Sequence, residues 1–330
     1  MRIFISLLTF FLATVLLPAS SAVAAGNCAD TASARPALER IETVMAAGRY
    51  ISYQPTSLQV IKGQPTQADE KSIEADLKVL RPRFDGIITY GSLNGAERIP
   101  DVAAKLGYRS VIMGVWDVTN AQERKNVIEA ARRQPQIVDG VSMGNEVVFG
   151  NRASYKDIAD AMASFRAAAP GLAVSTTEPF HMFLQPGADL MFPQMDFLLA
   201  NVHPVFESWF RTAPDANAAE FVTNVVDKLA GVYCGPVLVK ETGVPTAPAG
   251  EGYVPLRQAS FYVALAQRFK PERMRAFAYF SAFDAPWRAE DSGPVPGYHP
   301  EEAHWGLYDA ERWPKLVVSK IPLLPEEPEK

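Results

Sequence analysis

The sequence has 330 residues, of which 48% are hydrophobic and 21% are charged, with a formal net charge of -5 and a pI near 5.5. These proportions are typical of a globular protein with a sizeable core. The acidic balance gives no electrostatic basis for binding nucleic acid or an anionic membrane, so we expect a neutral or small-molecule partner.

The first 25 residues predict a secretory signal peptide. A positive start at Arg2 is followed by an almost wholly apolar stretch over residues 3–17 and then by small residues up to Ala25. The apolar stretch is near the lower limit for crossing a bilayer, so an uncleaved anchor is the alternative. We expect cleavage after Ala24 or Ala25, a secreted or periplasmic protein, and no stable membrane insertion after cleavage.

The chain has two cysteines, Cys28 and Cys234. An exported chain can oxidise such a pair, which would tie down the mature N-terminus. Two free or buried thiols are the alternative, because the sequence does not show whether the Cα atoms approach within about 7 Å. Two cysteines this far apart predict no metal site, and we see no ligand cluster that suggests a metal or an organic cofactor.

The predicted elements alternate along the chain after an N-terminal extension over residues 26–49. Within this extension, residues 35–48 have helical periodicity and end in Gly. Apolar stretches predict strands at 50–55, 86–92, 110–116, 140–147, 173–179, 197–206, 236–243 and 275–284. Amphipathic segments predict helices at 68–81, 96–106, 121–134, 155–169, 216–230 and 256–269. Eight strands separated by helices is the count of a (β/α)8 TIM barrel.

The near-continuous apolar character of these stretches, such as residues 110–116, is typical of parallel strands that are covered on both faces. A doubly wound sheet is the alternative fold. It is disfavoured because no phosphate-binding G-x-G-x-x-G lies between the first strand and the first helix. We therefore predict one (β/α)8 barrel over residues 50–322 and a flexible tail over residues 323–330.

Active sites of such barrels lie at the carboxyl ends of the strands, so the side chains there are the candidates for chemistry. The predicted strand ends carry Tyr53, Tyr90, Trp116, Asp117, Asn145, Glu146, Glu178, His203, Lys240, Glu241, Phe283 and Asp284. Two carboxylates and several aromatic rings around one mouth are typical of a site for a sugar.

Glu146 and Glu241 are three strands apart in the predicted barrel and would face each other across the mouth. Glycoside hydrolysis needs such a pair, one as acid and one as nucleophile or base. Either residue alone is more often a helix cap or a solvated turn. A carboxylate separation of about 5 Å would predict retention, and roughly 6.5 to 9.5 Å would predict inversion.

Several segments resemble, in order, the signature segments of glycoside hydrolase family 17, the β-1,3-glucanases. They are residues 144–146 (Gly-Asn-Glu), 201–206 (Asn-Val-His-Pro-Val-Phe), 241–246 (Glu-Thr-Gly-Val-Pro-Thr), 283–287 (Phe-Asp-Ala-Pro-Trp) and 304–307 (His-Trp-Gly-Leu). The resemblance implies a retaining mechanism on β-1,3-linked glucan, with Glu146 as acid/base and Glu241 as nucleophile. It also implies that Asn145 hydrogen-bonds the sugar 2-hydroxyl and that His203 lies on the substrate side.

The remaining candidates have a structural alternative each. Trp116, Phe283 and Trp287 are expected to stack on the sugar, and Phe206 and Trp209 are further candidates for stacking. Tyr53 and Tyr90 are expected to contact the substrate through their hydroxyls, and Glu178 through its carboxylate. Core packing or helix capping is the alternative for these side chains. Alternation along a strand turns Lys240 away from the mouth if Glu241 points in, so we expect Lys240 to form a buried or rim ion pair.

Three positions depart from the family pattern. Val244 and Ile88 stand where family members commonly carry Trp and Arg, and Ala285 stands where an acidic residue is frequent. None of these removes a reacting group, but they leave linkage and chain-length preference open. The alternatives are a transglycosylase with the same carboxylates, a non-catalytic glucan-binding barrel, and a barrel acting on β-1,4-linked glucan or mannan. We expect a β-glucan partner and a monomer.

Overall fold

The computed structural model describes residues 29–290 and 297–325. The predicted signal peptide and Cys28 lie outside these residues, so the signal peptide and the Cys28–Cys234 pairing stay predictions. Within the described ranges, no helix combines the length and the apolar character needed to cross a membrane.

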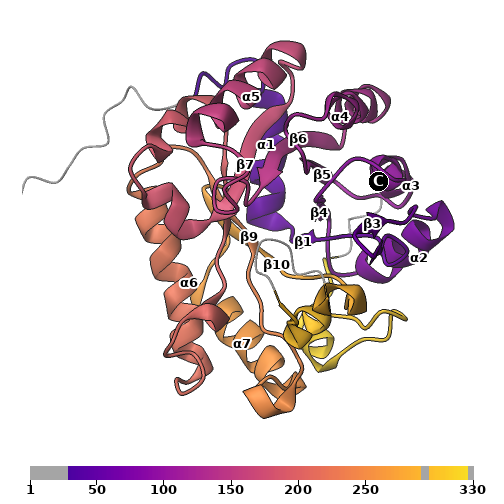
Figure 1. Cartoon of the computed structure of the whole chain (residues 1–330), viewed down its shortest axis with the longest axis vertical. Helices are drawn as coiled ribbons and strands as arrows, with labels where there is room; N and C mark the ends of the chain where they lie inside the picture. Colours follow the sequence, from indigo (N-terminus) through magenta and orange to yellow (C-terminus); the bar gives the residue numbers. More distant parts are fainter. Residues whose placement is uncertain (1–28, 291–296, 326–330) are drawn as a thin grey trace, which may run out of the picture.

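Eight parallel strands close into a barrel in chain order, with β1 paired to both β4 and β10 (Figure 1). The barrel strands are β1 (Tyr50–Ser52), β4 (Gly86–Ile88), β5 (Ser110–Val115), β6 (Val138–Asn145), β7 (Ala173–Pro179), β8 (Leu198–Asn201), β9 (Val237–Glu241) and β10 (Arg275–Tyr279). All six residues of β5 are buried, as expected for a strand covered by side chains inside and by helices outside. The predicted (β/α)8 barrel is confirmed.

The helices lie around the outside of the barrel, except the first, which covers its amino end. They are α1 (Arg35–Ala47), α2 (Glu70–Leu80), α3 (Ile99–Lys105), α4 (Ala121–Arg133), α5 (Tyr155–Ala168), α6 (Asp215–Ala230) and α7 (Pro255–Arg268). Local sequence sets several helix starts: the side chains of Asp69, Asn120 and Ser154 accept backbone N–H groups at the first turns of α2, α4 and α5. The connection from β7 to β8 has 3-10 turns in place of an α-helix.

Several strands end earlier than predicted at the mouth of the barrel. The sixth predicted strand, residues 197–206, is ordered as a strand only over Leu198–Asn201, and Pro204–Phe206 forms a 3-10 turn. Pro204 cannot donate a ladder hydrogen bond, which favours leaving the sheet at this point. The chain therefore turns out of the barrel just where the candidate residues begin.

The helix α1 of the N-terminal extension covers the amino end of the barrel. Its apolar face, including Leu38 and Ile41, packs in one cluster with inward-facing barrel residues such as Ile112 and Leu238. At the far end of the chain, the backbone N–H of Leu324 donates to a carbonyl before β4, so part of the predicted tail is attached to the barrel. Within the predicted tail, Leu323 and Leu324 are thus hydrogen-bonded to the rest of the chain.

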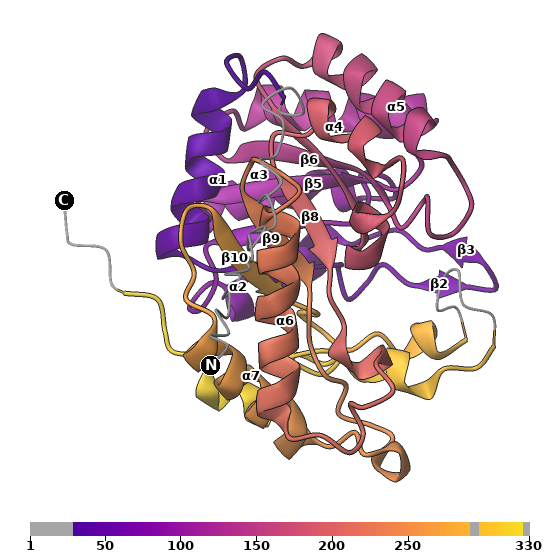
Figure 2. The same ribbon diagram turned by 90° about the vertical axis from the view of Figure 1, so that its left-hand side faces the viewer.

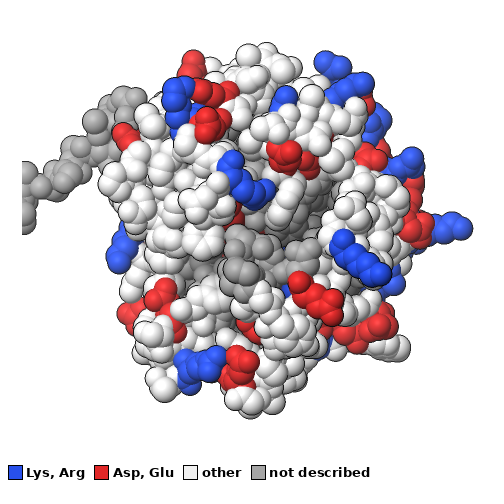
Figure 3. Space-filling model, viewed as in Figure 1, with Lys and Arg blue, Asp and Glu red and all other residues white. Residues whose placement is uncertain are grey.

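A two-stranded hairpin, β2 (Val60–Ile61) and β3 (Gln64–Pro65), rises at the opposite end of the barrel from α1 (Figure 2). Its turn residues Lys62 and Gly63 both have positive φ, 52° and 73°, as a tight hairpin turn requires. β2 packs against the 3-10 turn Pro286–Ala289 that follows β10. On the face shown in Figure 3, side chains of both charge signs are interspersed.

Candidate active site

The candidate site begins with an irregularity in strand β9. In the pairing of β8 with β9, Ala200 is opposite Val239 but Asn201 is opposite Glu241, so Lys240 is an extra residue. Such a bulge breaks the alternation of side chains along a strand. Lys240 and Glu241 consequently both reach the inside of the barrel mouth, and the two side chains approach to 3.5 Å (Nζ to Oε1).

The prediction that Lys240 points away from the mouth is therefore wrong, although the predicted ion pair exists. The lysine is 1% exposed, and its Nζ donates a 2.6 Å hydrogen bond to Oδ1 of Asn145 at the end of β6. The ammonium also lies 4.1 Å from the centre of the Tyr90 ring. The strict alternation rule failed because it cannot anticipate a bulge.

Glu241 ends β9 and is 6% exposed. Its Oε2 lies 3.3 Å from Nε2 of His203. Burial by itself raises the pKa of this carboxyl, but the charge of Lys240, the hydrogen bond and charge of His203 and the charge of Arg288 outweigh burial and lower the pKa to about 2. Glu241 is thus an ionised carboxylate at neutral and at mildly acidic pH.

Glu146 follows β6 in a tight turn and has a positive φ of 53°. The preceding Gly144 has a φ of 91°, and a Cβ there would come within 2.9 Å of the Val147 side chain. Burial and the negative charge of Glu241 raise the pKa of Glu146, while a 2.8 Å hydrogen bond from Nδ2 of Asn201 opposes this rise. Glu146 therefore holds its proton to higher pH than an ordinary glutamate.

Asn201 connects the two carboxylates. It is paired with Glu241 in the sheet register, and its amide donates to Glu146. The two carboxyl groups also sense each other's charge, because the negative charge of Glu241 helps to raise the pKa of Glu146. The pair thus consists of one carboxyl whose pKa is raised and one whose pKa is lowered, which is the pattern that a general acid and a nucleophile require.

A cavity of about 960 Å³ lies over these carboxylates. The predicted site residues that line it are Tyr53, Tyr90, Trp116, Asn145, Glu146, His203, Phe206, Glu241 and Trp287. Trp116 is 44% exposed, and the guanidinium of Arg152 lies 5.2 Å from the centre of its ring. The structure therefore brings nine of the twelve predicted residues to one cavity that is large enough for a small ligand.

The other predicted residues have structural contacts. Glu178 is fully buried, and its two oxygens accept the backbone N–H groups of Val148 and Phe149 at 2.8 and 3.1 Å. Phe283 is also buried, with its ring centre 6.2 Å from that of Tyr53. The hydroxyl of Tyr53 donates to Asp76 at 2.8 Å, so it points away from the carboxylate pair. These contacts engage the Glu178 carboxylate, the Phe283 ring and the Tyr53 hydroxyl with protein groups.

Four side chains around the pair were not singled out from sequence: Asn201, Phe280, Arg288 and Trp305. The rings of Phe280 and Trp305 pack edge-on against His203, with ring centres 5.4 and 5.1 Å away, and so orient its imidazole toward Glu241. Asn201 and Trp305 lie within the segments that resemble family 17, so those segments contained the signal for these two.

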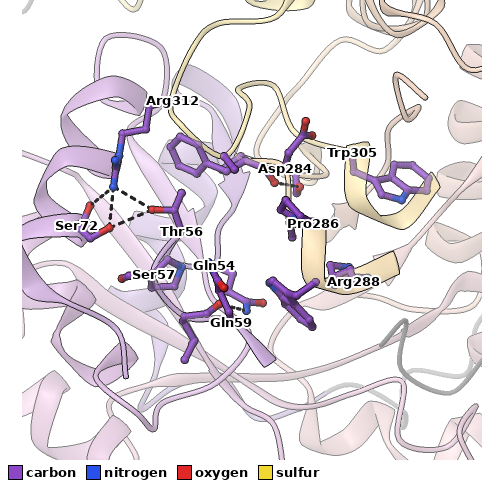
Figure 4. A pocket seen from close by; sticks show the side chains of 18 of the residues that line it. Gln54, Thr56, Ser57, Gln59, Ser72, Asp284, Pro286, Arg288, Trp305 and Arg312 are labelled. Atoms are coloured by element: carbon purple, nitrogen blue, oxygen red, sulfur yellow. Dashed lines mark hydrogen bonds between the residues drawn. The ribbon is translucent and has the colours of Figure 1, made fainter. Parts of the chain in front are cut away.

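A smaller cavity of about 370 Å³ adjoins the larger one at the ends of β1 and β10. Both cavities are lined by Gln54, Trp287 and Arg288. In Figure 4, Arg312 reaches down to Thr56 and Ser72 at one side of this smaller cavity, with its Nη2 2.7 Å from the Ser72 hydroxyl. The polar lining of this cavity extends the site beyond the carboxylates.

No metal site accompanies these groups in the described part of the chain. Over residues 29–290 and 297–325, no cluster of three or more His, Cys, Asp or Glu side chains is arranged to hold a metal ion.

A family model, described as the BtgE/BtgC glycoside hydrolase domain, matches residues 50–306 of the sequence. The chain belongs to this family. The matched region contains every barrel strand and both glutamates of the candidate site.

Two relatives illustrate the range of the BtgE/BtgC glycoside hydrolases. A protein from Arthroderma benhamiae named glucan 1,3-beta-glucosidase is 23% identical over 265 residues, which are 75% of this chain and 84% of that protein. An Aspergillus clavatus protein named probable beta-glucosidase btgE is 27% identical over 252 residues. Those residues are 73% of this chain but only 42% of the Aspergillus protein, so the chain spans less than half of that relative.

Solved structures share the fold. The glycoside hydrolase family 17 beta-1,3-glucanosyltransferase from Rhizomucor miehei superposes with a TM-score of 0.63 at 22% identity, covering 82% of this chain and 96% of that one. CJP38, a beta-1,3-glucanase and allergen of Cryptomeria japonica pollen, has a TM-score of 0.55 at 14% identity, covering 81% and 97%. The resemblance to family 17 predicted from the sequence is confirmed.

Proposed function

We propose that this member of the BtgE/BtgC family cleaves β-1,3-linked glucan by a retaining mechanism, with Glu146 as acid/base and Glu241 as nucleophile. The observation that carries this proposal is the opposite pKa shift of two carboxyls beside one cavity. The pKa of Glu146 is raised, and that of Glu241 is lowered to about 2. The names of the relative from Arthroderma and of the solved structures from Rhizomucor miehei and Cryptomeria japonica support the β-1,3 linkage.

The first step forms a bond between a Glu241 oxygen and the anomeric carbon of the sugar. The glycosidic C–O bond breaks, and its electron pair takes the proton of Glu146. In the second step, Glu146 removes a proton from water while the water oxygen attacks the anomeric carbon and releases Glu241. Asn145 is suited to donate to the sugar 2-hydroxyl, a contact that strengthens in the transition state.

The test compares wild type, Glu241→Ala and Glu146→Ala on β-1,3-, β-1,4- and β-1,6-linked glucans. We expect wild type to release sugar from the β-1,3 polymer and both variants to lose activity by several orders of magnitude. On an aryl β-glucoside, whose leaving group departs without a proton, added azide should restore turnover of Glu146→Ala with a glycosyl azide of retained configuration, because azide needs no general base. Equal activity of Glu241→Ala and wild type would refute the assignment of the nucleophile.

Transglycosylation is a second outcome of the same chemistry, since a sugar hydroxyl can replace water in the second step. The solved structure from Rhizomucor miehei carries the name glucanosyltransferase, which favours testing for it. Products longer than the supplied oligosaccharide would establish transfer. Binding of a β-1,3-glucan without any product from wild type would instead favour a non-catalytic barrel.

Stacking on exposed aromatic side chains is the proposed mode of glucan binding. Trp116 and Trp287 line the cavity, and Trp116 presents its ring to solvent. Export of the chain is also a proposal, which rests on the apolar N-terminal sequence. Sequencing the N-terminus of protein isolated from the periplasm or the medium tests it, with Gly26 or Ala25 expected as the first residue.

A further inference from the structure

We propose that Lys240 is a positioning residue for this reaction, which fixes the amide of Asn145 toward the sugar and anchors the Glu241 carboxylate by charge. The inference rests on the proposed function and adds a residue to it. Its starting observation is the bulge in β9, which places the residue before the nucleophile inside the barrel mouth and not on the outer face of the strand.

The surroundings of Lys240 hold its side chain in one place. The residue is 1% exposed, its ammonium lies over the ring of Tyr90 at 4.1 Å, and its backbone carbonyl accepts a 2.6 Å hydrogen bond from the hydroxyl of Ser52. Burial of an ammonium is costly unless charged or polar partners compensate. The compensating partners are Asn145 and Glu241, at 2.6 and 3.5 Å from Nζ.

The contact with Asn145 determines which way its amide faces. An ammonium has three donors and no acceptor, so the atom that faces Lys240 at 2.6 Å has to be Oδ1. The Nδ2 donors of Asn145 then point to the other side, into the cavity that Asn145 lines. A sugar 2-hydroxyl would thus meet an N–H donor, and a flipped amide would present the wrong group.

The contact with Glu241 sets the charge of the proposed nucleophile. The charged or titratable groups that act on Glu241 are Lys240, His203, Arg288, Glu146 and Tyr90. Lys240 is the foremost of the groups that lower the pKa of Glu241 against the opposing effect of burial. His203 adds a contact of 3.3 Å from its Nε2 to Oε2 of Glu241, whereas Lys240 acts from a position that is only 1% exposed.

The test measures the pH dependence of kcat/KM for Lys240→Met on laminari-oligosaccharides. Methionine has a similar length and no charge, so Glu241 should need a higher pH to ionise. The acid limb is the part of the pH profile in which kcat/KM falls as the pH decreases and Glu241 becomes protonated. We expect this limb to move upward by about 1 to 3 pH units, as for removal of an opposite charge within hydrogen-bonding range. Lys240→Arg, which retains the charge, should keep the acid limb close to that of wild type.

The matched control is Lys315→Met. Lys315 is a second largely buried lysine that pairs with a carboxylate, Asp284, at 2.6 Å. Its loss should lower the temperature of unfolding without moving the acid limb. A shift of equal size in Lys315→Met and Lys240→Met would overturn the proposal, because it would show a general effect of losing a buried charge.

A double-mutant cycle tests the amide contact. If Lys240 acts through Asn145, the loss of kcat/KM in Lys240→Met combined with Asn145→Ala should be smaller than the product of the separate losses. Multiplicative losses together with an unmoved acid limb would refute the inference. If Lys240→Met does not fold, the test rests on Lys240→Arg. An acid limb that moves upward in this variant, despite the retained charge, would overturn the proposed role of Lys240.

Failure of this inference is distinguishable from failure of the proposed function. Full activity of Glu241→Ala would remove the proposed function and the inference together. If Glu241→Ala is inactive, but folded Lys240→Met keeps the acid limb of wild type, only the role of Lys240 is refuted.

Discussion

Replacing Glu178 by Gln should remove a pH dependence of stability that the wild-type protein carries. Glu178 is fully buried, and burial raises the pKa of its carboxyl from 4.5 to about 7 despite two hydrogen bonds from backbone N–H groups. The unfolded chain loses this proton near pH 4.5, whereas the folded chain keeps it to about pH 7. Folding therefore takes up a proton in this window, and stability falls as pH rises through it.

The size of the effect follows from the same values. A rise in pKa from 4.5 to about 7 corresponds to about 3 kcal/mol, since each unit is worth about 1.4 kcal/mol. Wild type should lose this much free energy of unfolding between pH 4.5 and pH 7 relative to Glu178→Gln. The glutamine retains one acceptor and loses the other, so its stability should also be offset by about 1 to 3 kcal/mol at acidic pH.

Urea unfolding of wild type and Glu178→Gln at several pH values between 4 and 8 measures both quantities. Asp139, whose pKa burial also raises to about 7, contributes equally to both proteins and cancels in the difference. Glu220→Gln on the surface of α6 serves as the control and should keep the wild-type slope. Parallel slopes for wild type and Glu178→Gln would refute the reasoning. A raised KM with unchanged stability would instead indicate that Glu178 contacts substrate.

Further predictions concern the acid, the cavity wall and the smaller cavity. Asn201→Ala removes a hydrogen bond to Glu146 that is worth about 1.5 to 3 kcal/mol when Glu146 is charged. The pH above which kcat/KM falls should therefore rise by about 1 to 2 units. If this pH does not change, the hydrogen bond does not set the pKa of Glu146. Trp116→Ala should raise KM for long oligosaccharides by roughly tenfold, about 1.4 kcal/mol of contact energy, with kcat nearly unchanged, whereas a fall in kcat alone would contradict a binding role. Arg312→Met leaves the fully buried Asp76 without its 2.7 Å ion pair. The free energy of unfolding, measured in urea, should fall by about 3 to 5 kcal/mol. An unchanged midpoint of urea unfolding would contradict this prediction.

The barrel and the identity of the two glutamates were accessible from the sequence because each depends on local signals. Buried strands show as apolar stretches, and parallel order follows from their alternation with helices. Glu146 and Glu241 could be placed at the mouth because a strand end in a barrel points there regardless of the details of packing. Their proposed roles came from the resemblance to family 17. His203 and Asn145 followed from the segments around them.

Other roles depended on contacts between segments far apart in the chain. Tyr53 was expected to meet the sugar through its hydroxyl; it lines the larger cavity, but its hydroxyl bonds Asp76. Phe283 was expected to stack on the sugar; it lines the smaller cavity, and its ring packs on Tyr53. Glu178 was expected near substrate and instead holds backbone N–H groups after β6. A strand end gives the position of a residue but not the direction in which its side chain finds a partner.

The sequence by itself determined the closed barrel of eight parallel strands and the placement of two carboxylates at its mouth, because periodicity and strand ends are local properties. Only the tertiary structure decided the environment of those carboxylates. The bulge that brings Lys240 beside Glu241, and the amide of Asn201 that reaches Glu146, depend on the register between neighbouring strands. Register is fixed by packing across the whole barrel, and no stretch of the chain specifies it alone.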